Sequence, residues 1–331
     1  MLINTILDEQ TKMKSTPVIF SNRNGLKLFG ILEQPDSGAK NIAVLLLSPG
    51  IKMRVGPHRM YNKLSRVLVS NGFTVLRFDF YGLGDSEGEL DQKVLVDVYN
   101  SIQNGRYTED TIDAMDWVSR TYSIDSFILG GLCGGAITGM LAGSIDNRVK
   151  GLIALGLINV FEGGEENFSK FVTEGQLDEL KRGYVSKLTD INSWKRVITL
   201  KSDFRTIFKI LLKPFRVVSK RIREKLNRNT KKKIEFIHDD SSNTNPKFAP
   251  TFFSMLQHSR KMLLIYSGGD RLLWEFKEKF ESIYKSHLSD YSHMYDLHII
   301  PDANHILSLS EWEETMHNLV REWLETNFRN L

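Results

Sequence analysis

The segment "SFILGGLCGGAITGM", residues 126–140, constrains the fold more than any other part of the chain. A short apolar run leads directly into glycines, a single cysteine follows, and a second pair of glycines opens an apolar, helix-like stretch. A strand that passes through a strained turn straight into a helix needs such small residues, because only they let strand and helix approach closely. The pattern therefore predicts a sharp turn at Cys133, flanked by a strand and a helix.

A second glycine frame competes with the first one, because Gly84 to Gly88 reads G-x-S-x-G with Ser86 at its centre. Ser86 lies six residues beyond Phe80, where the preceding strand is expected to end, and no apolar helical repeat follows it. We therefore predict a loop here, in which Asp79 and Asp85 accept backbone N–H bonds and Ser86 is structural. The region also lacks the G-x-G-x-x-G pattern of a dinucleotide site.

Cys133 is the only cysteine of the 331 residues, which rules out an intramolecular disulfide and a cysteine-rich metal site. It is either a small buried hydrophobe or a nucleophile. A thiol at a helix N-terminus, next to a histidine, favours the reactive thiolate. In this frame we interpret Cys133 as a nucleophile, and we expect no cofactor and no metal.

Strand-like and helix-like patterns alternate along most of the chain. An early hairpin is expected at 17–35, where an Asn-Gly pair marks the turn. Later strands are expected at 41–50, 73–80, 126–132, 149–157, 261–267 and 294–301, and helices at 58–71, 107–120, 134–144, 272–287 and 311–328. This alternation predicts an α/β fold with a mainly parallel, doubly wound sheet.

The alternation stops between about residues 159 and 260, and a structureless loop of that length would be improbable. We therefore expect a core formed by 1–158 and 261–331, with a helical cap inserted at 159–260. Residues 195–233 of this insertion carry 15 lysines and arginines against only Asp203 and Glu224. Two readings stay open: a solvated cap helix packed over the site, or a surface that attracts an anionic partner such as an acidic polysaccharide, a coenzyme A thioester or a membrane face. Charge alone would also fit a nucleic-acid partner, but no recognisable binding motif supports one, so no nucleic-acid partner is expected.

Partners for the nucleophile are expected in the order acid, then histidine. Asp270 follows the strand "MLLIYS" and two glycines, and His305 stands between the last strand and the last helix. Asp302, three residues before His305, is the alternative acid. The N–H of Gly134, with that of Gly50 or Ile51 after the strand at 41–47, would form an oxyanion hole.

His58 and Arg59 begin the helix that follows the loop of Gly50 and Ile51. A role in lining the mouth of the site and a plain role in starting the helix are equally compatible with this position.

These motifs resemble the α/β-hydrolase superfamily over essentially the whole chain apart from the insertion. The segments "GPHRMYNKLSRVLVSNGFTVLRFDFYGLGDSEG", "GLCGGA" and "DANHILS" are similar to hydrolases associated with exosortase A systems and exopolysaccharide gene clusters, which are related to serine aminopeptidase-like hydrolases. The resemblance implies an α/β-hydrolase fold with a mainly parallel, eight-stranded sheet, helices on both faces and an inserted helical cap. It also maps the nucleophile onto Cys133, the acid onto Asp270 and the histidine onto His305. The chain departs from many relatives in having Ser48-Pro49-Gly50 where these have His-Gly.

The expected function is cleavage of an ester or thioester, with a small-molecule or lipid-like acyl substrate and a thioester acyl-enzyme intermediate. Two alternatives stay open: an acyltransferase that passes the acyl group from the same cysteine to an alcohol or thiol, and a non-catalytic binding protein on a hydrolase scaffold. The sequence has no apolar run long enough for a membrane span and no signal peptide pattern at its N-terminus, so a cytoplasmic protein is expected.

Overall fold

The computed structural model describes residues 6–8, 13–163, 234, 236 and 242–329. Apart from Ile234 and Phe236, these residues belong to one compact unit, formed by Met1–Thr173 together with His238–Leu331. Most of the expected cap, including the whole basic segment 195–233, lies outside the described residues. In the described part of the chain, no helix combines the length and the apolar character that crossing a membrane requires.

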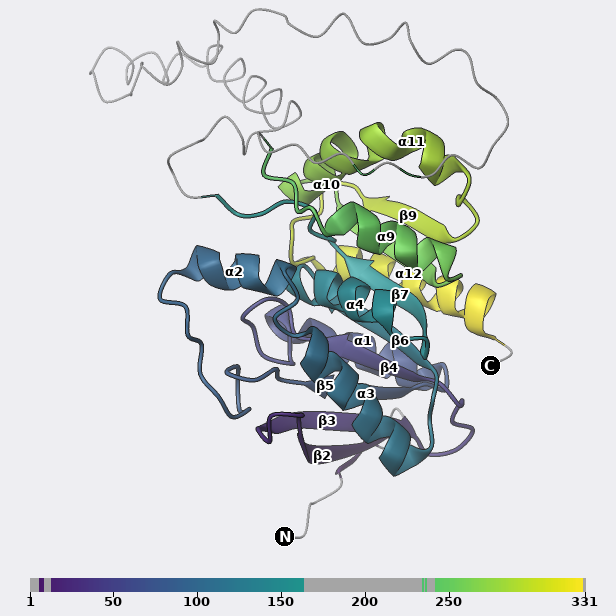
Figure 1. Ribbon diagram of the computed structural model, residues 1–331. Coiled ribbons are helices and arrows are strands. Elements are labelled where there is room, and N and C mark those ends of the chain that lie inside the picture. The colour runs from purple at the N-terminus through teal and green to yellow at the C-terminus, as the bar shows by residue number, and fades with distance from the viewer. Residues whose placement is uncertain (1–5, 9–12, 164–233, 235, 237–241, 330–331) are drawn as a thin grey trace, which may run out of the picture. The chain divides into compact units, whose positions relative to one another are not determined.

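A nine-stranded sheet runs through the middle of this unit in the order β1-β2-β3-β5-β4-β6-β7-β8-β9 (Figure 1). The strands up to β5 on one side pair antiparallel, and the six from β5 to β9 pair parallel. The strands are β1 (Ile6–Asp8), β2 (Met13–Ser21), β3 (Lys27–Pro35), β4 (Ala43–Leu47), β5 (Thr74–Phe78), β6 (Phe127–Leu132), β7 (Val149–Leu155), β8 (Lys261–Ser267) and β9 (Tyr295–Ile300).

The central strands are covered on both faces. Every residue of β4, β5 and β6 is buried, as the continuous apolar runs in their sequences predict for parallel strands inside an α/β core. The expected α/β fold with a mainly parallel, doubly wound sheet is confirmed, and the sheet contains one short strand more than the eight that were expected.

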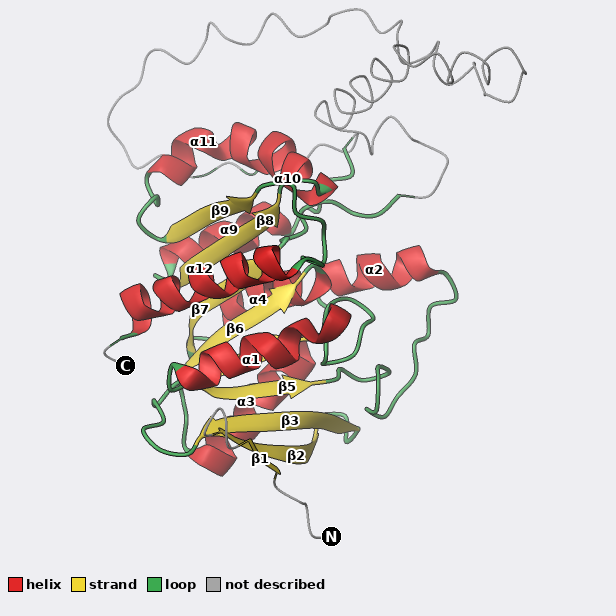
Figure 2. Ribbon diagram, turned by 180° about the vertical axis from the view of Figure 1, so that it is seen from behind, coloured by secondary structure: helices red, strands yellow, loops and turns green. Residues whose placement is uncertain are grey.

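Helices cover both faces of the sheet (Figures 1 and 2). On one face α1 packs against α12, and on the other face α4 packs against α2, α3 and α9. The helices are α1 (Met60–Ser70), α2 (Leu95–Gln103), α3 (Thr108–Tyr122), α4 (Gly134–Ile145), α9 (Phe248–Gln257), α10 (Arg271–Phe276), α11 (Ser282–Ser289) and α12 (Ser310–Phe328), with short turns of 3₁₀-helix at Pro57–Arg59 and of π-helix at Lys277–Glu281. All five helices expected from the sequence are present, the fourth of them as the consecutive segments from α10 to α11.

Helices α2 and α9 were not predicted from the sequence, and a physical reason explains each omission. Residues 94–98 read VLVDV, and their β-branched valines favour a strand, yet Val98 and Ile102 form the buried stripe of α2. Helix α9 lies inside the range 159–260 expected for the insertion, but it buries Phe248, Phe252 and Phe253 in the core. The chain thus returns to the core before residue 260.

The two described ends of the insertion lie side by side. Val160 and Thr244 form an antiparallel bridge. On either side of it, the N–H of Phe161 donates to the carbonyl of Asn243 and the N–H of Asn245 donates to that of Asn159. The chain therefore leaves the described core and re-enters it at adjacent positions.

Backbones come unusually close where β6 passes into α4. A side chain at Gly135 would overlap the carbonyl oxygen of Leu47 at the end of β4, and one at Gly131 would overlap the backbone of Gly135. Farther along α4, Gly139 packs against Leu152 of β7, as its small size suggests. The glycines of the elbow segment, residues 126–140, therefore set how closely α4 lies on the sheet.

We expect Gly135→Ala to lower the stability of the protein, because its methyl group would collide with a backbone carbonyl that cannot rotate away. The expected loss is about 1–3 kcal/mol in the free energy of unfolding. Gly143→Ala, on the same helix, is the control, since its methyl group would meet the flexible end of Met255. Equal midpoints for the two variants in thermal unfolding would contradict this account.

Candidate active site

Cys133 occupies the strained turn between β6 and α4. Its φ of 57° and ψ of −113° lie outside the regions that a residue with a side chain usually adopts. The turn is held from both sides, because the N–H of Cys133 donates to Leu155 at the end of β7 (2.8 Å) and its carbonyl accepts from Ile137 in α4 (3.2 Å). The side chain is partly buried and lines a cavity of about 660 Å³.

Tyr61 of α1 also stabilises the turn at Cys133. Its hydroxyl is buried, donates to the carbonyl of Leu47 at the end of β4 (2.8 Å) and accepts from the N–H of Leu132 (2.7 Å). Burial raises the pKa of Tyr61, so the hydroxyl keeps the proton that it donates. This role of Tyr61 was not predicted from the sequence, although its position in the apolar stripe of α1 made a hydroxyl there unusual.

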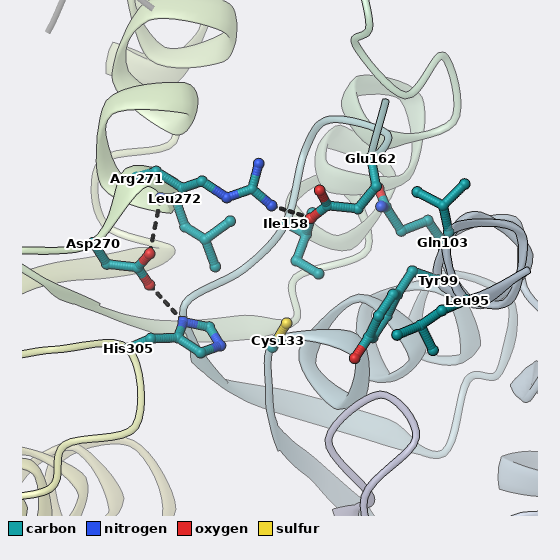
Figure 3. A pocket seen from close by; sticks show the side chains of 11 residues that line it. Leu95, Tyr99, Gln103, Cys133, Ile158, Glu162, Asp270, Arg271, Leu272 and His305 are labelled. Atoms are coloured by element: carbon teal, nitrogen blue, oxygen red, sulfur yellow. Dashed lines mark hydrogen bonds and ion pairs between the residues drawn. The ribbon is translucent and has the colours of Figure 1, made fainter. Parts of the chain in front are cut away.

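Asp270 and His305 form a hydrogen-bonded pair beside Cys133 (Figure 3). The Nδ1 atom of His305 lies 2.5 Å from Oδ2 of Asp270, and because an ionised carboxylate only accepts, Nδ1 carries the proton. Asp270 also caps α10, where its Oδ1 accepts from the N–H of Leu272 (3.3 Å). The carboxylate is thereby fixed in orientation, and Nε2 is the ring nitrogen left to face the cavity.

The two loops that carry this pair are joined through their backbones. The N–H of Gly268 donates to Ile300 at the end of β9, and the N–H of Gly269 donates to Ala303. Asp302, the alternative acid, is exposed in the turn between them with a φ of 56°. The structure therefore pairs His305 with Asp270.

The electrostatic environment favours a charged His305. Burial lowers the pKa of this histidine, but its hydrogen bonds with Asp270 and with the side chain of Cys133 outweigh that effect and raise the pKa to about 10. An imidazolium is therefore the main form at neutral pH, next to the sulfur of Cys133.

Backbone N–H groups stand near Cys133. Gly134 is the first residue of α4, where N–H groups have no partner within the helix. The loop after β4 lies against it, because a side chain at Gly134 would come within 2.8 Å of the backbone of Gly50. Ile51 follows in the same turn, in which the N–H of Lys52 donates to Pro49. The two backbone segments expected to form the oxyanion hole thus meet next to Cys133.

His58 holds the loop of His305. Its Nε2 donates to the carbonyl of Ile306 (2.6 Å), and its Nδ1 lies 4.0 Å from Oε1 of Glu313 in α12. Neither His58 nor Arg59 is among the described residues that line the cavity, and both are exposed with positive φ. The contact with Ile306 joins the start of α1 to the loop of His305, a positioning role that neither of the two expected roles had named.

The cavity has an apolar wall and a polar end. The apolar wall consists of Leu95, Val96 and Tyr99 from α2, Ile158 after β7, and Leu272 from α10. Gln103, Glu162 and Arg271 form the polar end. None of these residues was predicted from the sequence to line the cavity. Arg271 offered the clearest signal, since it is a charged residue directly after the expected acid.

The surroundings of Ser86 indicate a structural role. Its hydroxyl accepts from the N–H of Phe29 (2.9 Å) and donates to the carbonyl of Asp79 (2.6 Å), and it does not line the cavity. Asp79 accepts from the N–H groups of Arg54 and Asp85, as predicted. Asp85 differs from the prediction, because the contact of its carboxylate is with the guanidinium of Arg54. Among the described residues, no group of His, Cys, Asp and Glu side chains could hold a metal ion.

Comparisons with known proteins agree with this geometry. A family model described as the alpha/beta hydrolase fold matches residues 43–192. The chain is similar to a cold-adapted esterase from an Arctic intertidal metagenomic library (12% identity, 99% of both chains, TM-score 0.52) and to an esterase from Pyrococcus furiosus (14% identity, 98% of this chain and 96% of that one, TM-score 0.53). It is also similar to a dienelactone hydrolase from Anabaena variabilis (16% identity, 96% of this chain and 99% of that one, TM-score 0.52). The comparison with curated proteins gives no match. At these identities the likeness shows the fold alone, and the chain has the α/β-hydrolase fold.

We expect Tyr61→Phe to loosen the turn at Cys133, because the N–H of Leu132 would lose its acceptor in the interior. The cost should be about 1–3 kcal/mol of stability, together with a changed rate of alkylation by iodoacetamide, which reports on Cys133 as the only cysteine. Tyr266→Phe is the control, since it removes another buried hydroxyl bond, to Leu157. An alkylation rate altered equally in both variants would show that Tyr61 has no specific effect on the turn.

Proposed function

We propose that this protein is a hydrolase that cleaves an ester or thioester through Cys133, His305 and Asp270. The observation that carries the proposal is the position of Cys133, which stands in a strained turn and lines one cavity with a histidine that is hydrogen bonded to a carboxylate. The esterases and the dienelactone hydrolase of similar fold support it at the level of the reaction class. The motifs shared with hydrolases of exosortase A systems lead us to place it in that group.

In the first half of the reaction, the Cys133 thiolate attacks the carbonyl carbon, and the carbonyl oxygen becomes an oxyanion. The N–H groups of Gly134 and of Gly50 or Ile51 stabilise this oxyanion. When the bond to the leaving group breaks, Nε2 of the His305 imidazolium gives its proton to the departing oxygen or sulfur. The acyl group is now a thioester on Cys133, and His305 is neutral.

In the second half, neutral His305 takes a proton from a water molecule as that water attacks the thioester. The carbon–sulfur bond breaks, the acid leaves, and Cys133 returns to the thiolate beside an imidazolium. Asp270 keeps the ring oriented through Nδ1 in both halves. The raised pKa of His305 suits this cycle, because the histidine must hold a proton when the leaving group departs.

The proposal is tested with a panel of 4-nitrophenyl esters and acyl thioesters of increasing chain length. Cys133→Ala should lose about a thousandfold or more of kcat/KM, and mass spectrometry of the wild type should detect an acyl adduct on Cys133. Ser86→Ala is the matched control, because Ser86 stands in the other glycine frame and lies away from the cavity. Turnover that survives in Cys133→Ala and is lost in Ser86→Ala would overturn the assignment.

A pH profile tests the pair of His305 and Asp270. Because His305 acts as a proton donor, kcat/KM should fall as the pH rises through the pKa of His305, about 10. The Asp270 carboxylate helps to raise that pKa, so Asp270→Asn should move the alkaline limb to lower pH. Asp302→Asn changes an exposed carboxylate in the neighbouring turn and should leave the limb in place. A limb that moves in neither variant would remove Asp270 from the proposed mechanism.

A further inference from the structure

Among the described residues, Arg271 is the cation at the polar end of the cavity. Arg271 directly follows Asp270 and is the first residue of α10, so its side chain starts one residue from the proposed catalytic acid. Figure 3 shows the guanidinium of Arg271 and the carboxylate of Glu162 pointing toward each other, on the side of the cavity away from Leu95 and Tyr99. The proposed mechanism gives neither side chain a role.

The guanidinium of Arg271 has more N–H donors than its contacts with described side chains use. Its Nη1 donates to Oε1 of Glu275 (3.2 Å) and its Nη2 donates to Oε1 of Glu162. A guanidinium has five N–H donors in a planar fork, and these two contacts with described side chains use only two of them. The side chain is 39% exposed and lines the cavity, so a ligand bound there can reach the guanidinium.

The two carboxylates differ in how firmly they hold the arginine. Glu275 is fully buried and lies one turn farther along the same helix, which makes its contact a fixed part of α10. Glu162 is 32% exposed and comes from the segment after β7. Two hydrogen bonds with Asn100 fix the backbone of Glu162 (3.0 and 3.1 Å), so its side chain can turn toward solvent without any movement of the main chain.

Much of the remaining wall formed by described residues is apolar. Leu95, Val96, Ile158 and Leu272 are apolar, and an anion buried against them would be strongly destabilised. A guanidinium, in contrast, binds a carboxylate through two parallel hydrogen bonds. A substrate with an apolar stem along α2 and a carboxylate at Arg271 would match both ends of the cavity.

We propose that Arg271 determines specificity by binding a carboxylate on the substrate, and that Glu162 occupies this position when no substrate is bound. The inference rests on the proposed function, since it concerns which esters or thioesters the cavity accepts. It assigns an anionic, carboxylate-bearing acyl substrate to the enzyme. The role of Arg271 is binding, and it takes no part in the chemical steps.

Three 4-nitrophenyl esters of matched shape test the proposal: the monoester of adipic acid, its neutral isostere 6-methylheptanoate, and the cationic 5-(trimethylammonio)pentanoate. The quantity measured is the ratio of kcat/KM for the adipate ester to that for the neutral ester. Arg271→Gln should lower this ratio about tenfold or more, the value of one charge-assisted hydrogen bond. Arg271→Lys should recover only part of the loss, because an ammonium group lacks the planar fork.

Glu162→Gln should raise the same ratio, because the amide competes less well for the guanidinium. This second variant keeps the test valid if Arg271→Gln fails to fold around the buried Glu275. Arg148→Gln is the matched control. Arg148 also pairs with two carboxylates, Asp116 and Asp146, but it precedes β7 and therefore lies at the opposite end of the parallel strands from Arg271, which follows β8. The ratio measured for Arg148→Gln should equal that of the wild type.

Binding measurements separate this inference from the proposed function. In the Cys133→Ala background, calorimetry gives the Kd of each ester without turnover, and the adipate ester should bind more tightly than its isostere only when Arg271 is present. If the wild type hydrolysed none of the esters, this would count against the proposed function, while the binding preference would still decide the role of Arg271. An unchanged ratio in Arg271→Gln, no binding of the adipate ester, or a preference for the cationic ester that Glu162→Gln removes would each overturn the inference.

Discussion

The structure depends on one close contact between backbones, where α4 starts against the end of β4. No side chain fits at Gly131 or Gly135, because the carbonyl of Leu47 and the first turn of α4 already occupy that space. This contact brings the N-terminus of the helix onto the ends of the central strands and forces Cys133 into its positive φ. Tyr61 then joins β4 to the residue before the turn, so the strain is held by fully buried groups.

The histidine and its carboxylate reach Cys133 from the other half of the parallel sheet. Their loops follow β8 and β9, and hydrogen bonds from Gly268 and Gly269 bind the two loops together before any side chain takes part. His58 reaches the same loop from the start of α1 through the carbonyl of Ile306. The orientation of His305 is therefore set by main-chain contacts as well as by Asp270, which limits how far the ring can drift from the cavity.

The fold and the positions of Cys133, Asp270 and His305 could be predicted from the sequence because each depends on local patterns: buried apolar runs, and loops placed at the ends of strands. The cavity walls could not be predicted in this way. Helix α2 supplies Leu95 and Tyr99, yet the valines of residues 94–98 favour a strand, and only packing on α4 decides the outcome. The ion pair of Glu162 with Arg271 joins residues more than one hundred positions apart, and no local pattern reports such a pair. His58 was noticed for its place before a helix, whereas its contact with Ile306 depends on tertiary structure.

The bridge between Val160 and Thr244 has a consequence for how chains of this kind can diversify. The chain segments 159–161 and 243–245 are already held together at this bridge. The entropic cost of closing the chain between them therefore grows only slowly with its length. Segments of very different size could be exchanged at this point while β7, α9 and the residues around Cys133 keep their places. This junction is thus a place at which evolution or an engineer could graft a new segment onto an unchanged core.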